Sequence, residues 1–128
     1  MMGSIGRVGW SDAAAMKAAF ARIDPILDAW AKKFGLHIYH HYKDDEVRGT
    51  TVVDDQGTTY GIGLQDVGDS YLVTCGWTLG KKVNRQHVSK SWERQASIEE
   101  LPVCLDEAYA VVERWIAENG NTRTWVNA

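Results

Sequence analysis

The chain has 128 residues, of which 45% are hydrophobic and 24% charged, and its formal net charge is -3 at pH 7. This length suits one domain, and the composition is that of an ordinary globular protein rather than a disordered, fibrous or membrane protein. The mild charge gives no reason to expect a nucleic acid or a membrane as partner. We expect one domain over 1–128, with 1–10 as a flexible or docking N-terminus and 121–128 as a tail. Because no apolar block of secretory length opens the chain, we also expect a cytoplasmic protein.

Residues 11–35 have the pattern of an amphipathic helix. Ser11 is a good N-terminal cap, apolar residues then recur every three or four positions, and Gly35 is a typical helix stop. The pair Asp24-Pro25 interrupts this pattern. Because the apolar stripe keeps its phase across the proline, we favour one kinked helix; the alternative is two helices, the second beginning at Asp24-Pro25.

Between residues 36 and 79 the apolar period changes to two, which predicts strands separated by short turns. We expect four strands, near 36–43, 47–54, 58–65 and 70–79. Connections this short make neighbouring strands antiparallel, as in a meander. Large apolar residues alternate from Tyr60 to Leu64 and from Tyr71 to Leu79, and these side chains should face the helices. Residues 80–96 are polar and basic and predict a loop or an irregular edge strand.

The C-terminal part predicts a second helix. Ser97-Ile98-Glu99-Glu100 is a capping box, and the apolar face that follows runs as far as Trp115 before Gly120 ends it. The fold class is therefore α+β, an antiparallel sheet of about four strands packed on an N-terminal and a C-terminal helix in the order α-β-β-β-β-α. Cys75 and Cys104 fall at core positions, so we expect buried free thiols.

Motifs for catalysis or metal binding are weak in this chain. Within one strand His37 and His41 would lie about 13 Å apart, too far to share an ion, and His40 would point to the other face. No nucleophile elbow, zinc motif or complete dinucleotide motif is found. The basic residues between 81 and 94 could follow a phosphate backbone, but the rest of the chain is acidic and would oppose it. We therefore expect no catalytic residue, no metal and no cofactor.

Three glycines lie inside predicted strands and face away from the helices. They are Gly61, Gly63 and Gly76. Glycine weakens a strand and often marks the close approach of another group. Two interpretations are open: Trp92 or Trp125 folds over these glycines, or they form a shallow docking surface with an aromatic rim that includes Tyr39.

The arrangement of helix, meander and helix, with acidic turns and six tryptophans, resembles small bacterial immunity proteins of contact-dependent growth inhibition and other polymorphic toxin systems. The residues that carry this resemblance are the capping box before the Trp115 helix, the turn Asp54-Asp55-Gln56-Gly57 and the scattered tryptophans. The resemblance implies a cytoplasmic protein without catalysis that binds a toxin domain, such as a nuclease, and blocks it.

The acidic turns would complement a basic toxin, because opposite charge speeds encounter and selects the partner. The residues expected to bind it are Asp44, Asp45, Glu46, Asp54, Asp55 and Asp66, with Tyr39 and Trp92 as anchors. We expect the free protein to be a monomer. Two alternatives stay open: a small acidic secretion chaperone, which would normally be a dimer, and a small ligand-binding or enzymatic domain that uses the glycine-lined sheet face.

Overall fold

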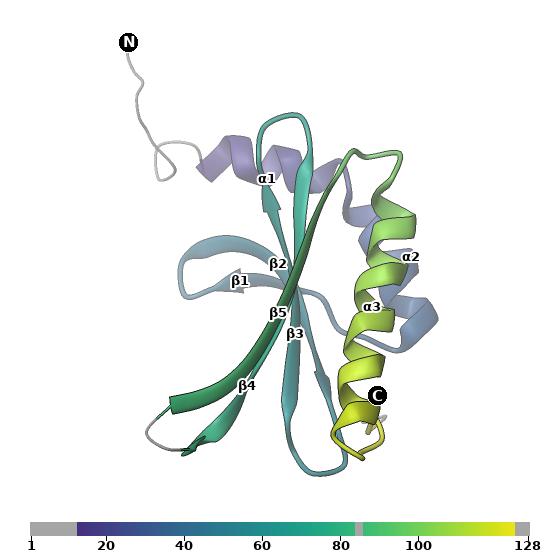
Figure 1. Ribbon diagram of the computed structural model, residues 1–128. Coiled ribbons are helices and arrows are strands. Elements are labelled where there is room, and N and C mark those ends of the chain that lie inside the picture. Colours follow the sequence, from purple (N-terminus) through teal and green to yellow (C-terminus); the bar gives the residue numbers. More distant parts are fainter. Residues whose placement is uncertain (1–12, 84–85, 125–128) are drawn as a thin grey trace.

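The computed structural model describes residues 13–83 and 86–124, which form a five-stranded antiparallel sheet and three helices (Figure 1). The helices are α1 (Ala13–Ala21), α2 (Asp24–Phe34) and α3 (Leu101–Glu118). The strands are β1 (Tyr39–Tyr42), β2 (Asp45–Val53), β3 (Thr59–Asp66), β4 (Tyr71–Val83) and β5 (Gln86–Ala96), and they lie in chain order. The predicted α+β meander between N-terminal and C-terminal helices is confirmed. The Ser11 cap and the residues after Thr124 lie outside the described range.

The N-terminal helical region consists of two helices, so the preference for one kinked helix is wrong. Phe20 accepts a hydrogen bond from the amide of Ile23, and α2 begins directly afterwards at Asp24. Pro25 lies in the first turn of α2, where its missing N–H group is no loss. The stop at Gly35 is confirmed, since this residue is left-handed with φ 63°.

Residues 80–96 contain the end of β4 and the whole of β5. Positions 84 and 85, between the two strands, are not described. The edge-strand alternative is therefore confirmed, and the loop is wrong. β5 pairs antiparallel with β4: Ala96 lies opposite Tyr71 at one end, and Gln86 lies opposite Val83 at the other. Charged side chains obscured the strand in the sequence. Two of them bind α3, because Lys90 contacts Glu118 and Arg94 contacts Glu107, each at 2.6 Å.

The helices α2 and α3 cover one face of the sheet and α1 lies across one end of it (Figure 1). The covered face carries the core that the alternation predicted, namely Tyr60, Ile62, Leu64, Tyr71, Val73, Cys75 and Trp77. Cys75 and Cys104 are buried free thiols, as expected. Burial raises the pKa of the Cys75 thiol to about 12, and this thiol donates to the carbonyl of Ala108. Among the described helices, none has the length and apolar character that a membrane crossing requires.

The predicted capping box is formed before α3. The amide of Ser97 donates to Glu100 Oε1 at 3.0 Å, and the amide of Glu100 donates to Ser97 Oγ at 3.2 Å. Ser97→Ala removes one of these bonds, so we expect the free energy of unfolding to fall by about 1 kcal/mol in urea denaturation. Ser91→Ala, at an exposed position of β5, is the control and should change it by less than about 0.5 kcal/mol. Equal stability of both variants would show that the box contributes nothing.

Candidate functional site

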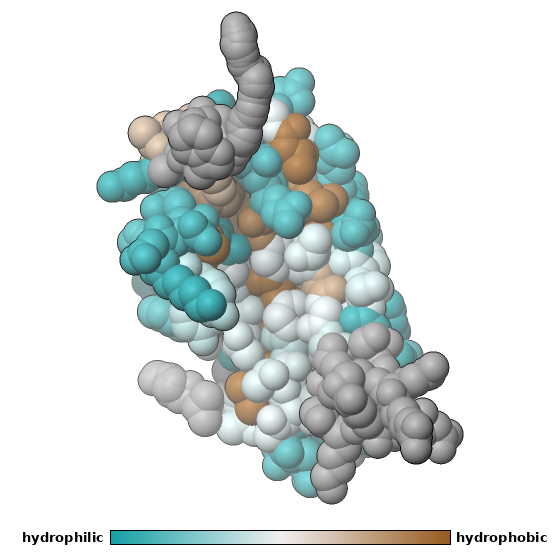
Figure 2. Space-filling model, turned by 90° about the vertical axis from the view of Figure 1, so that its left-hand side faces the viewer, coloured by the Kyte–Doolittle hydropathy of each residue, from teal (hydrophilic) through white to brown (hydrophobic). Residues whose placement is uncertain are grey.

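The second face of the sheet carries no helix in the described part of the chain, and glycines form its centre. Gly49 lies opposite Gly63, and Gly61 lies opposite Gly76, so four glycines occupy neighbouring positions on β2, β3 and β4. We call these four residues the glycine floor. Figure 2 shows the molecule from this side, where the middle of the surface is mostly pale and hydrophilic residues frame it.

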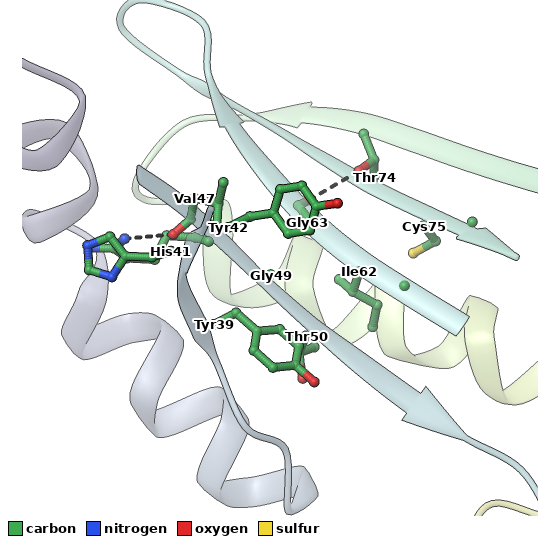
Figure 3. A pocket seen from close by; sticks show the side chains of 13 residues that line it. Tyr39, His41, Tyr42, Val47, Gly49, Thr50, Ile62, Gly63, Thr74 and Cys75 are labelled. Atoms are coloured by element: carbon green, nitrogen blue, oxygen red, sulfur yellow. Dashed lines mark hydrogen bonds between the residues drawn. The ribbon is translucent and has the colours of Figure 1, made fainter. Parts of the chain in front are cut away.

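A groove of about 580 Å³ lies over the glycine floor and is bounded by the β1–β2 hairpin. The hairpin projects away from α2 and α3 (Figure 1) and contributes Tyr39 and Tyr42, whose residues are 47% and 64% exposed. Figure 3 shows the two tyrosine rings on either side of Gly49. Large exposed aromatic rings beside an open floor are the arrangement expected of a binding surface.

The fold itself does not require three of the four floor glycines. Gly61, Gly63 and Gly76 have negative φ angles, and a Cβ atom on each would meet its nearest neighbour at 3.8, 3.5 and 3.7 Å, which is ordinary contact. Gly49 is tighter, because its Cβ would lie 3.2 Å from the carbonyl oxygen of Ile62. Since glycine weakens a strand, three glycines on one face that local sterics do not require mark this face as a candidate binding surface.

This interpretation predicts opposite effects for two glycine substitutions. Gly63→Ala should raise the free energy of unfolding by about 0.5–1 kcal/mol, because alanine fits the strand and loses less backbone entropy. Gly57→Ala should lower it by about 1–2 kcal/mol, because Gly57 has φ 82° while nothing lies within 4 Å of its added Cβ. Urea denaturation of both variants measures the difference. A loss of stability in Gly63→Ala would mean that the fold needs this glycine.

An ion-pair network holds the β1–β2 hairpin in place. Arg48 is buried and binds both carboxylate oxygens of Asp24, at 2.7 and 3.0 Å, and Oε2 of Glu46 at 2.7 Å. The same guanidinium donates to the backbone oxygens of His40 and Val47. The hydrogen bond to Asp24 is the largest cause of a raised pKa at Arg48, and the bond from Arg48 lowers the pKa of Glu46. The hairpin is thus attached to the start of α2 by a fixed positive charge.

No protein family, curated protein or solved structure matches this chain. The function therefore has to be inferred from the chemistry of the groove.

Three titratable side chains that line the groove, His41, Arg48 and Cys75, each contact another part of the protein. His41 Nε2 lies 3.4 Å from Glu46 Oε1, Arg48 is held by carboxylates, and the Cys75 thiol donates toward α3. Within the described residues no cluster of three or more His, Cys, Asp or Glu side chains could hold a metal ion. The ring of His37 packs edge-on against Tyr39 at 5.1 Å. The groove thus offers aromatic rings and flat peptide surface.

Asp54 is one of the acidic turn residues predicted to meet the partner, but the structure buries its carboxylate. It is 2% exposed, and its carboxylate accepts four hydrogen bonds of 2.8–2.9 Å. The donors are the amides of Gln56 and Thr58, the hydroxyl of Tyr60 and the side chain of Asn121. The turn folds back over its own first residue, so the Asp54 carboxylate is a buried acceptor within the fold. Asp55 is exposed and accepts a hydrogen bond from the amide of Thr122.

The remaining acidic residues lie at two ends of the sheet. Asp44 and Asp45 are exposed at the tip of the β1–β2 hairpin. Glu46 and Asp66 are half-buried and line one depression of about 720 Å³ beside α1, whereas Asp55 follows the opposite end of β2. The structure therefore brings four of the six predicted acids to one end of the molecule and separates Asp54 and Asp55 from them.

The two expected anchors lie on different faces. Tyr39 lines the groove, but Trp92 is half-buried against the core and lies opposite Cys75 on the helix-covered face. The interpretation that Trp92 folds over the glycines is therefore wrong, and Trp125 lies outside the described residues. Sequence reasoning missed Tyr42, because a regular strand would place Tyr39 and Tyr42 on opposite faces. A register shift between Tyr39 and His41 breaks this alternation.

Proposed function

We propose that this protein is a non-catalytic immunity protein of the cytoplasm that binds a cognate bacterial toxin domain of basic character, such as a nuclease, and blocks it. The observation that carries the proposal is the open sheet face, with its glycine floor and the exposed rings of Tyr39 and Tyr42. A face of this kind leaves space for a partner and supplies rigid aromatic contacts, which dominate the energetics of many interfaces.

Electrostatics favour a basic partner at this end of the molecule. Asp44 and Asp45 are exposed at the tip of the hairpin that bounds the groove, and Asp66 lines the neighbouring depression beside α1. Cations elsewhere on the described surface include three that are paired with acids: Lys33 with Asp106, Lys90 with Glu118 and Arg94 with Glu107. A basic toxin would be attracted to the exposed carboxylates of Asp44 and Asp45 at the hairpin, which speeds association and orients the encounter.

Co-expression with the toxin domain encoded by the neighbouring gene tests this function. Cells that carry both proteins should grow. The two purified proteins should form a complex in which mass spectrometry finds both chains intact. The combined change Asp44→Lys, Asp45→Lys and Asp66→Lys should slow association at low salt by about tenfold or more. Asp28→Lys, at an exposed position of α2, is the control and should leave the rate almost unchanged. Growth arrest in the presence of the native protein would contradict the proposal.

The groove volume favours one second candidate, a small-ligand binding domain. A volume of about 580 Å³ lies within the range of small-molecule sites. Such a domain would bind a compact apolar compound in the groove and would give no protection against the toxin. A secretion chaperone is a further alternative. A chaperone would be a dimer and the immunity protein a monomer, so measurement of the molecular mass in solution distinguishes the two.

A further inference from the structure

We infer that the groove receives one aromatic side chain from a positively charged segment of the partner, and that this ring lies on the glycine floor between Tyr39 and Tyr42. The inference rests on the proposed function and names the chemistry that the partner would present. It goes beyond that function because it assigns one contact to one place on the sheet.

Shape is the first argument for a ring. Gly61, Gly63 and Gly76 leave the peptide planes of two strands bare, and any side chain at these positions would project into the groove. A flat surface with a tyrosine on each side matches the thickness and faces of an aromatic ring, which packs well in offset or edge-to-face geometry.

Hydrogen bonding argues against an extended backbone as the occupant. The floor residues belong to strands that are paired on both sides, because β3 lies between β2 and β4, and β4 lies between β3 and β5. Their amide and carbonyl groups are consequently used within the sheet and cannot serve a peptide laid across its face. A backbone there would lose its water without gaining partners, whereas an apolar ring loses nothing by burial.

Charge around the groove is the second argument and selects a basic segment. Asp45 lies opposite Tyr42, and Glu93 lies opposite Thr74, so an acid flanks the groove on either side. Glu93 and Asp45 are both exposed. Lys43 is a cation of the hairpin whose Nζ lies 5.4 Å from the ring centre of Tyr42, and Arg48, which lines the groove, is paired with Asp24 and Glu46. A lysine or arginine next to the inserted ring in the partner could therefore pair with the carboxylate of Asp45 or of Glu93.

Three small compounds test the inference on the intact protein by NMR. Tryptamine carries an aromatic ring and an ammonium group, indole-3-propionate carries the ring with a carboxylate, and butylamine carries the ammonium group alone. We expect tryptamine to shift the amide signals of the four floor glycines, indole-3-propionate to bind several-fold more weakly, and butylamine to leave these signals in place. Shifts confined to other residues, or equal effects of tryptamine and butylamine, would overturn the inference.

A matched pair of variants separates this inference from the proposed function. Gly63→Val fills the floor with a residue that suits a strand. Gln65→Val is the control, because it places valine two positions along the same strand at a residue that does not line the groove. Affinity for the toxin domain should fall by about 30-fold or more in Gly63→Val, as for loss of an anchor residue, and stay near native in Gln65→Val. If both variants bind the toxin as the native protein does, the function stands and the inference is wrong. If the native protein binds no toxin while tryptamine still occupies the floor, the function is wrong and the groove is an aromatic-binding site.

Discussion

Replacing Arg48 by methionine is expected to lower the free energy of unfolding by about 3–5 kcal/mol. Methionine fills much of the space but leaves the carboxylates of Asp24 and Glu46 facing each other without the charge that joins them. The side chain of Arg48 is only 3% exposed, so water cannot replace the lost hydrogen bonds at low cost. Urea or thermal denaturation of the purified variant measures the loss.

Lys33→Met is the matched control for Arg48→Met, because Lys33 also pairs with a carboxylate but at the surface. Its Nζ lies 2.8 Å from Asp106, and its side chain is 54% exposed. Exposed pairs contribute about 0–1 kcal/mol, so this variant should stay close to native stability. Similar losses in the two variants would show that burial of the Arg48 network adds no stability.

Asp54→Ala is expected to cost about 3 kcal/mol, because four donors lose a buried acceptor at once. Two of these donors, Tyr60 and Asn121, come from different parts of the chain, so the carboxylate also ties the C-terminal segment to the sheet. Asp55→Ala is the control: this neighbour is exposed and accepts one hydrogen bond, so we expect a loss below about 1 kcal/mol. Comparable losses at the two positions would contradict the buried role of Asp54.

The same carboxylate predicts a dependence of stability on pH. Burial by itself raises the pKa of Asp54, but the hydrogen bonds that it accepts outweigh burial, and the pKa lies below its ordinary value. A lowered pKa in the folded state means that the stabilisation is complete above about pH 4 and is lost as the pH falls through the folded pKa. The free energy of unfolding of Asp54→Asn and of the native protein is measured by denaturation at neutral pH and at about pH 3. The difference between the two proteins should be smaller at pH 3. An unchanged difference would contradict the pKa argument.

Local patterns in the sequence predicted much of the fold because each has a short-range cause. The stop at Gly35, the capping box at Ser97 and the alternation from Tyr71 to Trp77 depend on neighbours within a few residues, and all three are confirmed. The division of the first helix at Asp24-Pro25 was only the alternative to one kinked helix, because an apolar stripe continues in phase whether or not the chain turns at Ile23. The sequence left the fifth strand open between a loop and an edge strand, because its charged side chains find partners on α3, far away in the sequence.

Part of the candidate site was also visible in the sequence. Gly61, Gly63 and Gly76 indicated a bare sheet face, since glycine inside a strand has few other uses. The role of Asp54 was not visible, because the same turn residues serve a solvated tip and a buried acceptor. Tyr42 lines the groove because of a register shift on β1. This shift depends on the pairing of two strands and cannot be predicted from the residue pattern.

The central claim is that three floor glycines, Gly61, Gly63 and Gly76, serve a partner and not the fold. The most direct measurement is the dissociation constant of the toxin domain from Gly63→Val, with urea denaturation confirming that the variant is folded. We predict a variant at least as stable as the native protein that binds the toxin far more weakly. A variant that is equally stable and binds with native affinity would contradict the claim.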